Sequence, residues 1–261
     1  MLFDNYSSPE PMYFKRIKRV KLKVDAAKLY FKSKYYNWQK PSSVTIKGVH
    51  LSIPKNPTED LKQALYCGYY ESNELRIISS HLKPEDRVME LGTGLGFLSA
   101  FCARKIGNDR VFTYEANPGL KPIIQENYAL NKVCPQLKIC MLGSEPGEKT
   151  FYVSDALWDS STIEFTENLK PIQVPVKSFN QEIERLNPSF LIVDIEGAEY
   201  ELCQSTDFHN VKKLSMELHE SLIGAEKAEF VKSKLRENGF RENNKYSSRS
   251  YQQEELFWER N

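Results

Sequence analysis

The sequence has few cysteines, and none of them is spaced for metal binding. The five cysteines in its 261 residues include no Cys-x-x-Cys pair. Their number is odd and two of them lie in apolar runs, which favours free, buried thiols over a disulfide framework or a zinc cage. The five are Cys67, Cys102, Cys134, Cys140 and Cys203.

Membrane and secretion signals are also missing from the sequence. No stretch approaches the roughly 20 consecutive apolar residues that a bilayer-spanning helix needs. Residues 1–10 do not combine a basic start with an apolar core, so we expect no secretory signal. Together with free thiols, these absences predict a cytoplasmic protein.

The chain has no overall excess of one charge. Its 36 basic and 35 acidic side chains give a net charge of +1, which argues against a strongly basic nucleic-acid binder. With 40% hydrophobic and 27% charged residues it is typical of a globular protein, and 12 glycines and 13 prolines exclude collagen-like and low-complexity classes. The length predicts one large domain, or one domain with an extension.

Basic residues are concentrated near the N-terminus. Residues 13–40 contain ten basic side chains and one acid, Asp25, for a charge of +9, whereas residues 41–261 carry −6. Such a segment could contact an anionic membrane, a nucleic acid or an acidic substrate. The simpler expectation is that it packs its apolar face on the main domain and leaves its basic side chains in water. Spacings of three and four predict that it is helical, from Tyr13, Ile17, Val20, Val24, Ala27 and Phe31.

The remaining chain alternates between strand and helix patterns. This alternation predicts an α/β fold with a mostly parallel sheet and helices on both faces. We place a basic helical extension with short strands at residues 1–57 and the main domain at residues 58–261. We expect helices over residues 61–82, 97–106, 121–132 and 227–238, and strands over residues 87–91, 110–114, 137–142, 149–153, 172–176, 190–195, 213–218 and 254–259.

A glycine-rich turn joins an apolar strand to a helix pattern at Glu90-Leu-Gly-Thr-Gly-Leu-Gly96. Glycines permit a tight turn and let a ligand approach the backbone. The dinucleotide pattern would need a glycine at Phe97, and no Gly-Lys-Ser/Thr follows as in a P-loop. Glu90 would repel a pyrophosphate and attract an ammonium group, which favours S-adenosylmethionine over NAD. A helix-capping role is the alternative for Glu90.

A second acid, Glu115, ends the next predicted strand, 25 residues after Glu90. An acid at this place accepts hydrogen bonds from ribose hydroxyls in nucleoside-binding α/β folds, including those that bind NAD. Glu115 therefore predicts a nucleoside without identifying it. A capping or turn role is the alternative.

Several segments between roughly residues 60 and 220 resemble, in order, the FkbM-type S-adenosylmethionine-dependent methyltransferases. The block from Asp194 to Glu199 is the most specific of them. The commoner form of the first motif is Asp-Ile-Gly-Ala-Asn, so Thr93 and Gly94 stand here in place of Ala and Asn. The segments are Gly68-Tyr-Tyr-Glu71 with Glu74, Glu90 to Gly96, Tyr114-Glu-Ala-Asn-Pro118, Asn127, Asn131, Val174-Pro-Val176, Asp194-Ile-Glu-Gly-Ala-Glu199 and Glu217-Leu-His219.

The resemblance implies a Rossmann-like class I methyltransferase core and O-methylation, often of sugars or natural products. It also implies a set of cofactor contacts, with Asp194 among them and Glu71 in the lid of the pocket. The methionine part would meet Glu90, Gly92, Thr93, Gly94 and Gly96, the ribose Glu115, Ala116 and Asn117, and the adenine Gly143 and Ser144.

Acids and a histidine follow two predicted strands farther along the chain. Asp194 and Glu196 come after a buried strand, and His219 ends the next, where such sheets bind ligands. O-methylation needs an oxygen in line with the S–CH3 bond and removal of one proton. Asp194, Glu196 and His219 are therefore candidate bases. A structural, hydrogen-bonded role is the alternative for His219, and a first-turn helix acid is the interpretation preferred for Glu199.

A divalent metal is a second account of the same residues. Asp194, Glu196, Glu217 and His219 carry ligand atoms for Mg or Mn, and an ion there would lower the pKa of the acceptor. Their sequence spacing is not tight, so the metal-free mechanism is preferred. The polar segment from Trp158 to Thr162 would cover the acceptor or stack on a sugar; a surface loop with one buried Trp is the alternative.

The sequence thus favours an O-methyltransferase for a hydroxyl of a sugar or small natural product, so its partner would be a small-molecule or glycan acceptor. One alternative is a nucleic-acid methyltransferase docking through residues 13–40. The −6 charge of residues 41–261 and the lack of an Asn/Asp-Pro-Pro-aromatic motif argue against it. Another is a non-catalytic membrane-surface or scaffold module, against which Glu90, Glu115 and the glycines argue. Peripheral membrane contact of residues 13–40 is a further option, and no oligomeric state is predicted.

Overall fold

The structure is a computed structural model that describes residues 32–153, 170–204, 206–249 and 253–261. The chain forms two compact units, Met1–Pro41 and Ser42–Asn261. In the first, residues 32–39 are helical, and the side chains of Tyr35 and Trp38 are exposed. The rest of the predicted basic helix lies outside the described residues. Within the described ranges, no helix combines the length and apolar character needed to cross a membrane.

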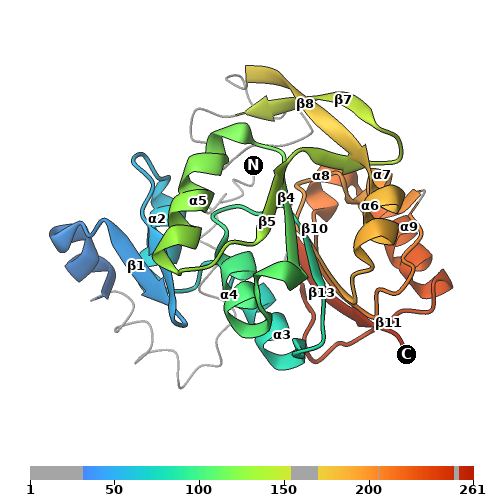
Figure 1. The fold of residues 1–261 in the computed structure, drawn as a ribbon, viewed down its shortest axis with the longest axis horizontal. Coiled ribbons are helices and arrows are strands. Elements are labelled where there is room, and N and C mark those ends of the chain that lie inside the picture. The colour runs from blue at the N-terminus through green and yellow to red at the C-terminus, as the bar shows by residue number, and fades with distance from the viewer. Residues whose placement is uncertain (1–31, 154–169, 205, 250–252) are drawn as a thin grey trace, which may run out of the picture. The chain divides into compact units, whose positions relative to one another are not determined.

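The second unit is built on a mixed, mainly parallel sheet (Figure 1). Its order is β11-β13-β10-β9-β3-β4-β5, with β12 paired to β13; neighbours from β10 to β5 run parallel, and β13 is antiparallel to β10. The predicted fold class is confirmed. The strands are β3 (Val88–Leu91), β4 (Val111–Glu115), β5 (Gln136–Ile139), β9 (Phe190–Val193), β10 (Lys213–Leu218), β11 (Arg241–Glu242), β12 (Ser248–Arg249) and β13 (Glu254–Glu259).

Helices cover both faces of this sheet, which is why β3, β4 and β9 are buried along their whole length. In Figure 1, α4 (Phe97–Ile106) and α5 (Lys121–Leu130) lie on one side, with α6 (Phe179–Leu186), α7 (Glu199–Gln204) and α9 (Ala225–Glu237) on the other. The shorter helices are α2 (Glu59–Cys67), α3 (Ser72–His81), α8 (Glu220–Ile223) and the 3-10 turns η2 (Asn108–Arg110) and η3 (Pro118–Leu120).

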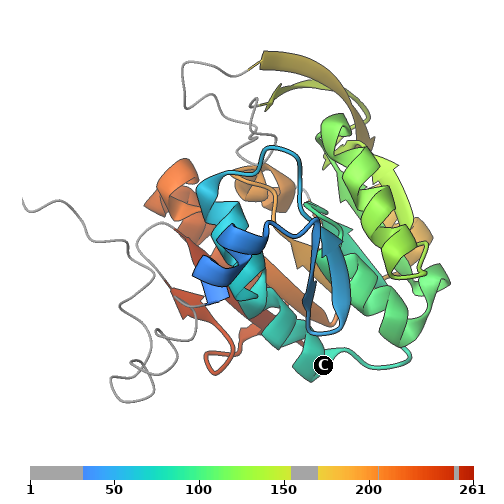
Figure 2. The same ribbon diagram turned by 90° about the vertical axis from the view of Figure 1, so that its left-hand side faces the viewer.

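A hairpin of β1 (Ser43–Ile46) and β2 (Val49–Ser52) lies against α5 (Figure 2). The amide oxygen of Asn127 accepts from the backbone of Ser52 at 2.7 Å, and that of Asn131 accepts from His50 at 2.8 Å. Two asparagines that carry part of the FkbM resemblance therefore attach this hairpin to the main fold. The hairpin belongs to the compact unit Ser42–Asn261, whereas the sequence interpretation grouped these strands with the N-terminal extension.

Two sequence expectations for secondary structure were wrong, and one helix was missed. The helix expected over 61–82 is broken into α2 and α3, because Gly68 and Glu71 have positive φ angles of 80° and 44°. The strand expected over 137–142 divides into β5, in the main sheet, and β6 (Met141–Gly143), in a separate sheet of order β6-β8-β7. Helix α6 was not predicted.

The separate sheet contains β7 (Gly147–Val153) and β8 (Lys170–Ser178), which confirms the strands expected over 149–153 and 172–176. Met141, Phe151, Val174 and Val176 form its small apolar core. The expected loop from Trp158 to Thr162 lies outside the described residues.

Candidate active site

The glycine loop begins where β3 ends and leads directly into α4. Gly92 has a φ of 84°, and a Cβ atom added to it would lie 1.7 Å from the backbone oxygen of Asp194. The Asp194 amide in turn donates to the carbonyl of Leu91 at 2.9 Å. Only a residue without a side chain fits here, so the loop and the end of β9 are held in contact.

Glu115, at the end of β4, holds the glycine loop through its carboxylate. Oε2 accepts from the amides of Thr93 at 3.0 Å and Gly94 at 3.1 Å, and Oε1 accepts from the amide of Asn117 at 2.8 Å. Burial raises the pKa of Glu115, and these backbone donors lower it. The predicted ribose acid is thus at the loop and already fixes its shape. Its contact with a ribose stays a prediction.

Glu90 lies under the same loop and is 1% exposed. Its Oε2 accepts from the Thr113 hydroxyl at 2.6 Å, and the Thr113 and Thr93 hydroxyls are hydrogen-bonded to each other. Burial raises the pKa of Glu90 to about 7, although the hydrogen bond from Thr113 lowers it. Its attraction for an ammonium group stays a prediction, and the structure shows its carboxylate hydrogen-bonded to Thr113.

Tyr70 and Glu71, between α2 and α3, lie beside the middle of the loop. A Cβ on Gly94 would come 2.9 Å from the Tyr70 hydroxyl and 3.2 Å from Glu71 Oε1. The Leu95 amide donates to the Tyr70 hydroxyl at 3.4 Å. Burial raises the pKa of Glu71 to about 8, with further contributions from the charges of Glu90 and Glu217. Glu71 therefore lies beside the glycine loop, and its role in a lid of the cofactor pocket stays a prediction.

The remaining predicted cofactor residues have mixed surroundings. Asn117 is buried, and its side chain caps η3 by accepting from the Gly119 amide at 2.9 Å. Ala116 packs against the core of the small sheet. Gly143 ends β6, and Ser144 follows it as an exposed residue. Gly96 caps the start of α4 with a φ of 75° and is packed against Tyr128.

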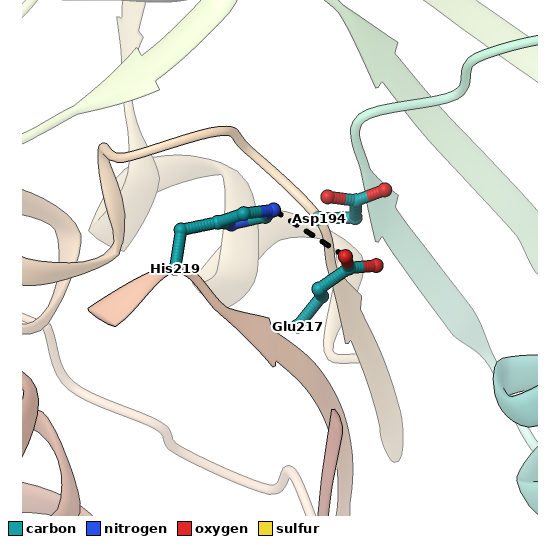
Figure 3. A group of neighbouring side chains, drawn as sticks. All are labelled: Asp194, Glu217 and His219. Carbon is teal, nitrogen blue, oxygen red and sulfur yellow. Dashed lines mark ion pairs between the residues drawn. The ribbon is translucent and has the colours of Figure 1, made fainter. Parts of the chain in front are cut away.

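Carboxylates and one histidine gather at the ends of β9 and β10 (Figure 3). The Nε2 atom of His219 lies 3.2 Å from Glu196 Oε2 and 3.4 Å from Glu217 Oε1, and its Nδ1 atom lies 2.8 Å from Glu199 Oε1. Asp194 faces the same group, and its Oδ1 is buried without a hydrogen-bond partner among the described residues. The structure brings together all three predicted catalytic residues.

Proton affinities in this cluster are strongly perturbed. Burial, followed by the charges of Glu217 and Glu196, raises the pKa of Asp194 well above its usual range. Burial alone would lower the pKa of His219, but Glu199, Glu217 and the nearby charges raise it to about 12. The imidazole is therefore in its cationic, doubly protonated form at neutral pH when no other cation is bound beside it. A protonated imidazole cannot accept a proton, so His219 is a weak candidate for the base.

Sequence reasoning missed two contributors to the site and undervalued a third. Tyr70 lay inside the resemblance without a role, and Thr113 was visible only as a polar residue in an apolar strand. Glu199, interpreted as a helix-start acid, does open α7, but it is fully buried and binds His219. The only sequence signal for this contact was that Glu199 follows the candidate base Glu196 by three residues.

A cavity of about 430 Å³ includes in its wall Gly197, the residue that follows Glu196 in the chain. Its walls come from β7, α7, α8 and α9 and combine aromatic, basic and acidic side chains. They are Lys149, Thr150, Tyr152, Gly197, Tyr200, Glu201, Ile223 and Lys227. A polar organic molecule is the kind of ligand that such a lining suits.

Solved structures show low sequence identity to this chain. A ribosomal protein L11 methylase from Lactobacillus delbrueckii subsp. bulgaricus is 16% identical, with a TM-score of 0.45, over 73% of this chain and 77% of that one. A Pyrococcus abyssi tRNA (uracil-54, C5)-methyltransferase with S-adenosyl-L-homocysteine is 12% identical, with a TM-score of 0.47; the match covers 84% of this chain and 44% of that one. M. jannaschii TYW2 in complex with AdoMet is 13% identical, with a TM-score of 0.44; the match covers 84% of this chain and 86% of that one.

Comparison with curated proteins gives no significant match. The profile of the methyltransferase FkbM domain matches residues 91–242, which is more than half of the chain. That range runs from the end of β3 through the glycine loop and Glu115 to the Asp194–His219 cluster. The chain therefore belongs to the FkbM methyltransferase family and is an S-adenosylmethionine-dependent methyltransferase.

Proposed function

We propose that this methyltransferase methylates a hydroxyl oxygen of a small polar molecule, such as a sugar. The observation that carries the proposal is the acidic cluster at the ends of β9 and β10. The Asp194 backbone lies against the glycine loop, and Gly197, next to Glu196 in the chain, lines a polar cavity. Two tyrosines and two lysines in that cavity supply surfaces for stacking and hydrogen bonding. Such groups suit a polyhydroxylated ring better than an apolar acceptor.

The residues around the glycine loop suit the methyl donor. S-adenosylmethionine carries a sulfonium and an ammonium group and supplies, when bound, an electrophilic methyl group. Burial raises the pKa of the carboxyl groups of Glu71, Glu90 and Asp194, and one Asp194 oxygen has no hydrogen-bond partner among the described residues. In the proposal, Glu115 and the glycine loop hold the nucleoside, and these acids favour the cationic end.

Glu196 is the proposed proton acceptor. Its side chain is 47% exposed, and the next residue, Gly197, lines the cavity, whereas the Asp194 oxygen is buried and His219 is 5% exposed. Glu196 also has a positive φ of 45°, a strained conformation that functional sites often retain. Glu196 takes the hydroxyl proton as the oxygen–methyl bond forms and the sulfur–methyl bond breaks.

Two measurements test this function separately. Calorimetric titration with S-adenosylhomocysteine should give binding for the wild type and at least a tenfold loss for Glu115→Ala, with Glu184→Gln, an exposed acid on α6, as control. A screen of hydroxyl, amine and thiol acceptors with radiolabelled donor then identifies the accepting atom. Methylation confined to amines or to RNA would overturn the O-methylation proposal, and absence of cofactor binding would overturn its premise.

A further inference from the structure

The orientation of His219 is fixed by a carboxylate behind it. Glu199 is 0% exposed, and its Oε1 lies 2.8 Å from His219 Nδ1 and accepts from the Gly197 amide at 3.1 Å. A carboxylate at this distance places a proton on Nδ1 and turns Nε2 toward the site. Histidines that bind metals are oriented in this way by a carboxylate on the other ring nitrogen.

The atoms in front of Nε2 are all hydrogen-bond acceptors when their carboxyl groups are ionised. Glu196 Oε2 faces it at 3.2 Å. Glu217 Oε1 faces it at 3.4 Å, and Asp194 lies beside them, as Figure 3 shows for the latter two residues. A proton on Nε2 would satisfy these two glutamates but leave Asp194 Oδ1, a buried atom with no partner among the described residues. Buried polar atoms of this kind ordinarily have a partner, and here a cation among the oxygens would supply it.

The spacing of the group also suits a metal ion. One donor atom each from Asp194, Glu217 and His219 all lie within 4.8 Å of one another. Ligand atoms around an ion with bonds of about 2.1 Å lie roughly 3.0–4.2 Å apart, so a small inward shift brings the donors into range. Among the described residues, this is the one group of three His, Cys, Asp or Glu side chains whose donor atoms lie this close together.

We infer that Asp194, Glu217 and the Nε2 atom of His219 bind a divalent cation, with Glu199 as the carboxylate that orients the histidine. Two carboxylates and one imidazole suit an ion such as Mn²⁺, which takes both oxygen and nitrogen ligands. This inference deepens the proposed function and rests on it for its catalytic role. A bound ion would hold the acceptor oxygen and lower the pKa of its hydroxyl. Glu196 would remain outside the ligand set as the proton acceptor.

Metal binding is tested without any cofactor or acceptor present. Metal-stripped wild-type protein titrated with MnCl₂ should remove one equivalent of free Mn²⁺ from the electron paramagnetic resonance spectrum. Pulsed measurements on the bound ion should show coupling to an imidazole nitrogen. Asp194→Asn and Glu217→Gln should each weaken binding at least tenfold, and Glu199→Gln about 10- to 100-fold without being a ligand itself. Exposed-acid controls Asp109→Asn and Glu184→Gln should bind as the wild type does.

Circular dichroism checks the fold of each variant, and the nitrogen coupling in the wild type needs no variant at all. An undiminished Mn²⁺ signal at millimolar metal, or bound Mn²⁺ without nitrogen coupling, would overturn the inference. If S-adenosylhomocysteine still binds in that case, the proposed function stands. Conversely, Mn²⁺ binding with the expected variant losses but no cofactor binding would support the metal site and refute its catalytic role.

Discussion

Two neighbouring parts of one sheet edge use the same residue types in opposite ways. At the ends of β3 and β4, the Glu90 carboxylate has a hydroxyl donor and both oxygens of Glu115 have backbone donors. At the ends of β9 and β10, carboxylates surround one histidine, and buried oxygens of Asp194 and Glu199 have no donor among the described residues. Acidic residues alone therefore do not define a site. What distinguishes the two parts is whether the protein itself provides hydrogen-bond donors to the carboxylate oxygens.

This difference separates a preformed part of the site from an incomplete one. The first part has its loop shape fixed by internal hydrogen bonds before any ligand arrives. The second gains its missing partners only from something that enters it, whether a proton, a metal ion or the acceptor. Substitutions should accordingly affect folding most at β3 and β4 and catalysis most at β9 and β10.

The largest effect is expected for Glu196→Gln, which removes the proposed proton acceptor. Loss of a general base typically costs 10²–10⁴-fold in rate, so kcat should fall by about that factor. Binding of S-adenosylhomocysteine should stay within about twofold of the wild type, because Glu196 lies beyond the loop. Steady-state kinetics and calorimetry measure the two quantities. A variant that retains most of its kcat would assign the base elsewhere in the cluster.

A change at the contact between the two parts should rank next. Gly92→Ala places a Cβ 1.7 Å from the Asp194 carbonyl oxygen, and overpacking of this kind costs about 3 kcal/mol of unfolding free energy. Urea unfolding would measure the loss. The matched control is Gly147→Ala in β7, where a Cβ meets no atom within 4 Å. Equal stability of the two variants would mean that the loop and β9 are not in rigid contact.

The pH dependence of stability should reveal the buried acid at Glu90. Its pKa is raised from 4.5 to about 7, so the folded state retains a proton that the unfolded chain loses. Stability should therefore fall as pH rises from 4.5 to 7, by about 3 kcal/mol for this group, and stay level above that. In thermal unfolding series, Glu90→Gln should flatten this part of the profile. An unchanged slope would show that Glu90 is ionised in the folded protein.

A smaller effect on stability is expected when a hydrogen-bond donor is removed at the ends of β3 and β4, so that a carboxylate there lacks a donor as those at β9 and β10 do. Thr113→Val keeps the shape of the side chain but removes the donor to Glu90, at a cost of about 1–3 kcal/mol. The loss should be greatest above pH 7, where Glu90 is ionised, and small at pH 5. Urea unfolding at both pH values is the measurement. A loss independent of pH would point to packing rather than to the hydrogen bond.

Local patterns in the sequence predicted most of the fold because each has a local cause. The glycine loop, α4 and the buried strand β9 follow from turn residues and apolar runs. The break between α2 and α3 was missed because the apolar spacing continues on both sides of Gly68–Glu71. The division of residues 136–143 between two sheets depends on strand pairing with distant parts of the chain, which no local pattern specifies.

The candidate site was predictable to a similar depth. Asp194, Glu196 and His219 were predicted as site residues because they follow or end predicted strands, and the structure places them together. Which carboxylate oxygens have donors was not predictable, because the donors are backbone amides and hydroxyls from other elements. The buried pairing of Glu199 with His219 depends on how α7 turns back after β9, a tertiary relation.

The small sheet has a consequence for how this enzyme could diverge. Strand β7 supplies Lys149, Thr150 and Tyr152 to the cavity from the edge of that sheet, apart from the strands that carry the glycine loop. Substitutions at these positions alter the cavity wall without changing the buried core, where most substitutions destabilise a protein. Under the proposed function, selection would exchange one acceptor for another along β7 while the methyl-donor machinery is inherited unchanged. Libraries that randomise these three positions are the economical route to new acceptors.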